Sequence, residues 1–81
     1  MATVSLTVKF GVVVRRLRTE AGWSQEELAA RCGLHRTYIG SIERGEKTVT
    51  IETANKLAVA LRVALSELIG KVEQELDKNN I

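Results

Sequence analysis

The sequence has no proline, one cysteine and three aromatic residues among its 81 positions. The lone cysteine, Cys32, excludes an internal disulfide and a cysteine-rich metal site, and we interpret it as a small buried apolar residue. The lack of proline favours a helical domain over a sandwich or barrel, whose many turns are rich in glycine and proline. No apolar run reaches the roughly 18–20 residues of a membrane span, and the start of the chain lacks the pattern of a signal peptide. We therefore expect a cytoplasmic protein without a membrane anchor, a metal or a cofactor.

The net charge is only +2, but it is unevenly distributed along the chain. Residues 1–50 carry eight basic and five acidic side chains, whereas residues 51–81 carry four and five. The N-terminal part is therefore the better candidate for contact with a polyanion, although ordinary surface charge explains the same numbers.

The spacing of apolar residues predicts one compact, all-α domain of five helices over residues 1–81. A chain of this length buries a modest fraction of its surface, so its core must be efficient or completed by a partner. The alternation of Val4, Leu6 and Val8 is interpreted as an extended arm or a helix start, because no second strand exists to pair with it. The predicted helices span residues 7–21, 25–32, 36–44, 51–62 and 65–77, with a frayed tail after them.

Local signals mark where these helices begin and end. Ser24 is the expected N-cap of the second helix, and Glu27 three positions later completes a capping box. Gly33 and Gly45 suit the left-handed conformation in which helices often end. Thr50 is the expected N-cap of the fourth helix. The inward residues of that helix are predicted to be Ile51, Ala54, Leu57, Ala58 and Leu61.

Residues 24–45, SQEELAARCGLHRTYIGSIERG, join the second and third predicted helices through a tight turn. This arrangement predicts a helix-turn-helix, whose second helix lies in the major groove of DNA. Arg36 can bind guanine bidentately, and Thr37 offers a hydroxyl and a methyl group for thymine. Solvated side chains are the alternative interpretation. Gly40 also lies off the apolar face of the third helix, and the candidates for base readout on that outer face are Arg36, Thr37, Tyr38 and Ser41.

A second set of polar side chains is expected to contact DNA phosphates. Gln25 begins the second helix, where the helix N-terminus adds a partial positive charge. His35 occupies the N-cap of the third helix and has no neighbour at the spacing of metal ligands or of a catalytic nucleophile. Ordinary surface positions are the alternative. The full set is Ser24, Gln25, His35, Arg44, Lys47 and Thr48.

Arg18 and Glu43 lie beside the inward stripes of the first and third predicted helices. We expect them to form an ion pair that joins these helices, so that Arg18 has a structural role instead of contacting DNA. Removal of one partner would leave the other uncompensated and cost several kcal/mol.

The last predicted helix carries more apolar surface than one small core uses. Its Gly70 marks either a close helix approach or a kink. In a two-fold dimer, two recognition helices would occupy successive major grooves about 34 Å apart and require a palindromic operator. The residues expected at the dimer interface are Leu65, Leu68, Ile69, Val72 and Leu76.

With these features in place, residues 9–69 resemble the Xre/Cro-type helix-turn-helix family of bacterial and phage regulators. The resemblance rests on FGVVVRRLR, GWSQEELA, the turn at Gly33, IERG and TIETANKLAVAL. It implies a lambda-repressor-like domain that binds operators as a dimer. It also implies phosphate contact at Gln25, base readout at Arg36, Thr37 and Ser41, and an ion pair between Arg18 and Glu43.

Within that family, HRTYIGSIERG followed by TI is similar to controller proteins of restriction–modification systems. This implies a small homodimer that binds double-stranded DNA upstream of its own gene and the endonuclease gene, activating at low concentration and repressing at high concentration. Activation implies RNA polymerase as a partner. Glu26 and Glu27 are a candidate surface for it, and an ordinary solvated face is the favoured alternative interpretation of these two residues. The loop EKTVT lacks the Arg-Asn pair of many controllers, and Ala64 replaces a common serine cap.

Two other functions are compatible with the sequence. A phage-type repressor or an antitoxin would share the DNA chemistry, but the tail is short for binding a toxin. An interaction adaptor that does not bind DNA would have no need of Gln25, Arg36 and Thr37. An enzyme is not expected, because no nucleophile–base pair, carboxylate dyad or metal cluster is visible.

Overall fold

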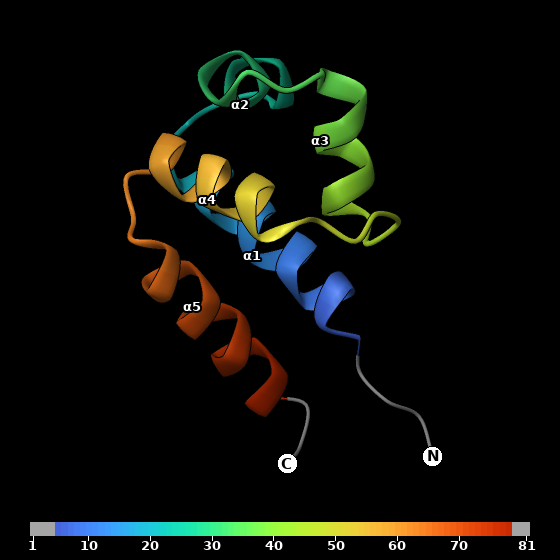
Figure 1. Ribbon diagram of the computed structural model, residues 1–81, viewed down its shortest axis with the longest axis vertical. Coiled ribbons are helices and arrows are strands. Elements are labelled where there is room, and N and C mark those ends of the chain that lie inside the picture. Colours follow the sequence, from blue (N-terminus) through green and yellow to red (C-terminus); the bar gives the residue numbers. More distant parts are fainter. Residues whose placement is uncertain (1–4, 79–81) are drawn as a thin grey trace.

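The computed structural model describes residues 5–78, which form five α-helices joined by short turns. The start of α1 and the end of α5 lie at the same end of the molecule, and α2 lies at the opposite end (Figure 1). Of the alternating residues Val4, Leu6 and Val8, the last two lie in α1, whereas Val4 and the last residues of the expected tail lie outside the described residues. The helices are α1 (Leu6–Glu20), α2 (Gln25–Cys32), α3 (Arg36–Glu43), α4 (Ile51–Ala60) and α5 (Leu65–Asp77).

Side-chain caps fix where four of these helices begin. Ser24 and Thr50 accept hydrogen bonds from the backbone N–H groups three residues later, as predicted. Ser5 caps α1 by accepting from the N–H of Thr7, so this helix begins one residue earlier than expected. Ala64 occupies the same position before α5 and provides no side-chain hydrogen bond.

The first four helices end in a shared pattern, in which the chain turns through a left-handed residue. Gly22, Gly33 and Gly45 have φ values of 80°, 68° and 75°. After α4 the same conformation is adopted by Arg62, at φ 61°. This turn ends α4 at Ala60, two residues before the predicted end, because the N–H groups of Arg62 and Val63 bond back to carbonyls of the helix.

The hydrophobic core takes residues from all five helices, with α1 packed between α3 and α5. Leu68 and Val72 of α5 are fully buried inside this core, so their expected place at a dimer interface is wrong. Their side chains complete one copy of the fold and are unavailable to a second. The buried apolar residues are Phe10, Val13, Val14, Leu28, Ala29, Ile39, Ile42, Ala54, Leu57, Ala58, Leu68 and Val72.

A glycine allows α3 to approach α1 closely. A Cβ atom added at Gly11 would fall on the carbonyl oxygen of Ile42 and lie 2.8 Å from that of Glu43. Gly70 has no such role inside the molecule, because a Cβ there would meet no atom within 4 Å and α5 continues through it. No helix within residues 5–78 is long and apolar enough to cross a membrane.

Candidate nucleic-acid interface

The first turn of α3 presents its polar side chains to solvent. Arg36 and Thr37 are exposed, while Tyr38 and Ser41 are half-buried at the edge of the helix. Gly40, expected on the same outer face, is buried instead. Its lack of a side chain leaves room for its neighbours, because an added Cβ would lie 3.0 Å from Nη1 of Arg44 and 3.6 Å from Oε1 of Gln25.

His35 caps α3 with its ring. Its Nδ1 accepts a 3.2 Å hydrogen bond from the backbone N–H of Thr37. A neutral imidazole whose Nδ1 accepts carries its proton on Nε2. His35 is exposed, so this ring both orders the start of the predicted recognition helix and offers an Nε2–H donor to solvent.

Arg18 and Glu43 form the expected ion pair, and it is largely shielded from solvent. Nε and Nη2 of Arg18 donate to the two carboxylate oxygens of Glu43 at 2.6 and 3.0 Å. Nη1 of the same guanidinium donates to the carbonyl of Trp23 at 2.8 Å, just before α2. The hydrogen bonds that Arg18 donates to Glu43 raise the pKa of Arg18 above its usual value.

Gln25 is joined to the same carboxylate. Its Nε2 donates to Oε1 of Glu43 at 3.1 Å, a contact that the sequence did not reveal. The side chain is half-buried, and the contact fixes the position of the amide at the start of α2. The three side chains together hold α1, α2 and α3 in one arrangement.

Arg44, an expected phosphate contact, is paired in this structure. Its guanidinium donates two hydrogen bonds to Glu46, from Nε at 2.9 Å and from Nη2 at 3.2 Å. This contact lowers the pKa of the Glu46 carboxyl group and raises that of Arg44. Glu46 was not among the residues predicted from the sequence, although two opposite charges on either side of Gly45 indicate such a pair.

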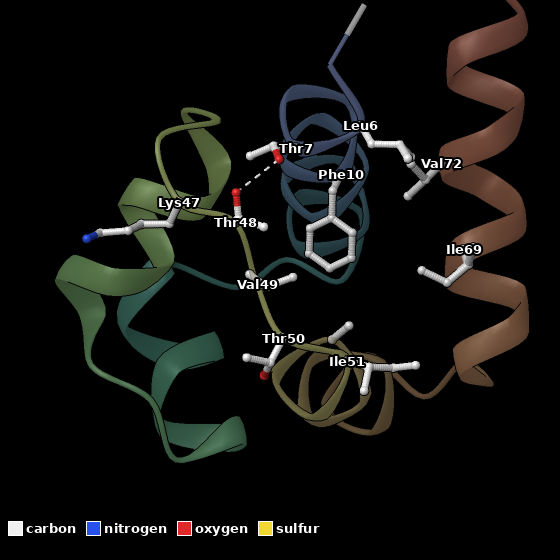
Figure 2. Close-up of a pocket in the computed structure, with 11 residues that line it drawn as sticks. Leu6, Thr7, Phe10, Lys47, Thr48, Val49, Thr50, Ile51, Ile69 and Val72 are labelled. Atoms are coloured by element: carbon white, nitrogen blue, oxygen red, sulfur yellow. Dashed lines mark hydrogen bonds between the residues drawn. The ribbon is translucent and has the colours of Figure 1, made fainter.

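The other expected phosphate contacts, Lys47, Thr48 and Ser24, are exposed. The Oγ1 atoms of Thr48 and Thr7 lie 3.4 Å apart, which ties the loop after α3 to the first turn of α1 (Figure 2). The Ser24 hydroxyl accepts from the backbone of α2, and its own proton can still be donated outward.

An open apolar groove of about 270 Å³ lies on one side of this loop, between the starts of α1 and α4 and the face of α5. Figure 2 shows Phe10 inside it, with the side chains of Leu6, Ile51 and Ile69 around it. Ile51 was predicted to point inward, yet it is 73% exposed, and Leu6 and Ile69 are 59% and 39% exposed. At the start of α4 the inward face begins with Ala54 instead.

Two further expectations concern reactive groups. Cys32 is half-buried, its thiol donates to the carbonyl of Leu28 at 3.0 Å, and burial raises its pKa. Within residues 5–78, no group of three or more His, Cys, Asp or Glu side chains is placed to hold a metal ion.

A family model described as Helix-turn-helix matches residues 14–68, more than half of the chain. The chain belongs to the helix-turn-helix family. The control protein C.BamHI of Bacillus amyloliquefaciens is 40% identical over 79 residues, which cover 90% of this chain and 98% of that protein.

Solved structures of restriction–modification controller proteins share the helix-turn-helix fold of this chain. C.AhdI of Aeromonas hydrophila is 48% identical with a TM-score of 0.74, covering 76% of this chain and 94% of its own. A C.Esp1396I tetramer in complex with its natural 35 base-pair operator is 31% identical with a TM-score of 0.83. The match covers 91% of this chain and 97% of the C.Esp1396I chain. The predicted all-α fold and the family resemblance are confirmed: the chain is a helix-turn-helix transcriptional regulator similar to controller proteins.

Proposed function

We propose that this regulator is the controller of a restriction–modification system. It binds an operator upstream of its own gene as a homodimer, activating at low concentration and repressing at high concentration. The observation that carries this proposal is the exposed pair Arg36 and Thr37, in the first turn of a helix anchored to α1 and α2. Similarity to control proteins such as C.BamHI supports the choice of system.

Arg36, Thr37 and Ser41 read base edges, with Tyr38 beside them. Arginine binds O6 and N7 of guanine in a fork, whereas a threonine hydroxyl and methyl group suit thymine. Ser24, Gln25, His35, Arg44, Lys47 and Thr48 hold phosphates and fix the register. Glu43 accepts a hydrogen bond from one N–H of the Gln25 amide, so the second N–H remains for a phosphate oxygen.

The apolar groove beside α5 is our candidate for the dimer interface. Ile51, Ile69 and Leu6 expose apolar side chains around it, and Leu65 and Leu76 remain half-buried candidates on α5. A two-fold contact uses the same surface on both copies, so Ile51 of one copy would meet the groove of the other. This replaces the interface through Leu68 and Val72, which lie in the core.

Activation requires contact with RNA polymerase, and α2 provides the candidate surface. Glu27 pairs with Arg31 at 2.9 Å, which leaves Glu26 as the better placed acid for a basic partner. A regulator of this kind carries out no chemical step. It works in the compartment that holds the DNA, which in a bacterium is the cytoplasm.

A footprint on the DNA upstream of the gene tests the function. We expect two protected half-sites related by two-fold symmetry, with centres about 34 Å apart. Affinity should fall steeply between 50 and 200 mM salt, because each neutralised phosphate releases counterions. Protection at distant promoters alone would contradict the controller role, and protection of a single half-site would contradict the dimer.

A charge in the groove tests the interface. Ile51→Glu should shift the sedimentation coefficient to that of a monomer and weaken operator binding. Val59→Glu is the matched control, because Val59 is 68% exposed on the same helix and does not line the groove. A dimer that withstands Ile51→Glu would place the interface elsewhere.

A further inference from the structure

Arg44 lies immediately after α3, on the side of that helix where α2 begins. Its Nη1 and the Oε1 of Gln25 both border the bare backbone of Gly40. The guanidinium is therefore beside the amide that we assign to a DNA phosphate. Nη1 faces this side, whereas Nε and Nη2 on another edge of the guanidinium are already occupied by the carboxylate of Glu46.

A carboxylate that binds an arginine in this way uses the donors that a phosphate would use. Both anions accept two parallel hydrogen bonds from the guanidinium fork. The Arg44 and Glu46 side chains are 58% and 55% exposed, so no surrounding structure holds the pair together. Exchange of one anion for another therefore requires only a rotation of exposed side chains.

We propose that Glu46 is an intramolecular competitor for Arg44: a DNA phosphate must displace Glu46 before it can bind the Nε and Nη2 edge of the guanidinium. This inference rests on the proposed function. Its consequence is a lower affinity for DNA of any sequence, because phosphate contacts supply most non-specific affinity. Glu46 thus limits the time that the regulator spends on random DNA while the base contacts of α3 stay intact.

The expected effect is modest, since exposed ion pairs contribute little free energy and are screened by salt. At low salt, Glu46→Gln should tighten binding by about two- to five-fold on both operator and random DNA. The gain should shrink as salt rises.

A double-mutant cycle tests whether Glu46 acts through Arg44. The wild type, Glu46→Gln, Arg44→Gln and the double variant are compared for dissociation constants on the upstream operator fragment and on a random duplex. Glu73→Gln makes the same change in net charge and serves as the control, because Glu73 is an exposed residue of α5.

We expect Glu46→Gln to increase DNA affinity clearly more when Arg44 is present than when Arg44 is replaced. Glu73→Gln should increase affinity less than Glu46→Gln does in either background. Equal gains in both backgrounds would overturn the inference, because Glu46 would then act as a general negative charge. No gain or weaker binding would also overturn it while the proposed function stands. An Arg44→Gln variant that binds like the wild type would overturn it and remove Arg44 from the phosphate contacts, while the controller role stands. A wild type without preference for the upstream fragment would contradict the proposed function itself.

Discussion

Arg18 and Glu43 lie far apart in the sequence, and two hydrogen bonds of 2.6 and 3.0 Å join them side by side. Only 3% of the Glu43 side chain and 12% of the Arg18 side chain are exposed. Since Glu43 also accepts from Gln25, one carboxylate links the core helix α1 with both helices of the helix-turn-helix. The geometry of the DNA-binding unit therefore depends on a charged contact in addition to apolar packing.

Glu43→Gln should lower the free energy of unfolding by about 3 kcal/mol, because it leaves the shielded Arg18 guanidinium without its counter-charge. Urea denaturation followed by circular dichroism measures this change. Glu46→Gln is the control: it removes a carboxylate from an exposed pair and should leave the denaturation midpoint unchanged. Equal midpoints for wild type and Glu43→Gln would mean that the pair adds nothing to the fold.

Two glycine substitutions should have opposite effects. Gly11→Ala should destabilise the protein by about 3 kcal/mol or more, because its Cβ would overlap the backbone of α3. Gly70→Ala should stabilise it by about 0.5–1 kcal/mol, since the position is helical and open. Thermal unfolding of both variants tests the close approach of α1 and α3. A harmless Gly11→Ala would argue against that approach.

Ala64→Ser should stabilise α5. The backbone before the helix is already extended, and Glu67 three residues later would complete a capping box. We expect a gain of about 1 kcal/mol in the free energy of unfolding. Ala30→Ser, at an exposed site inside α2, is the matched control and should cost a few tenths of a kcal/mol. A loss of stability in Ala64→Ser would contradict the assigned helix start.

Stability should depend on pH through Glu75. Arg16 donates a hydrogen bond of 2.6 Å to this carboxylate, which lowers its pKa below the ordinary value of 4.5. A depressed pKa in the folded state means that the stabilisation is present above pH 4.5 and is lost as the pH falls through the folded pKa. The difference in unfolding free energy between wild type and Glu75→Gln should therefore shrink in acid. A difference that stays constant from pH 7 to pH 3 would exclude this linkage.

Much of the fold was predictable because its signals are local. Caps such as Ser24 and Thr50, and the stops at Gly22, Gly33 and Gly45, act within a few residues. The bounds of α2 were therefore predicted correctly, and the apolar spacing alone predicted those of α5. The end of α4 was not, because Arg62 adopts a conformation that usually marks glycine.

The partition of apolar residues between core and surface was less predictable. Helical spacing gives a stripe, but the neighbouring helices decide how much of it is covered. Packing in the core covers Leu68 and Val72, whereas Ile51 at the first turn of α4 stays 73% exposed. The contact of Gln25 with Glu43 likewise depends on how α2 meets α3, which spacing alone does not give.

We propose above that α3 reads a specific operator through Arg36. The most direct measurement compares the binding of wild type and Arg36→Ala to the upstream operator fragment and to random DNA at one salt concentration. We predict that Arg36→Ala loses about 1–3 kcal/mol on the operator, relaxes preference at one base position and binds random DNA nearly as the wild type does. Equal losses on both DNAs would show that Arg36 contacts phosphate alone and would contradict the account.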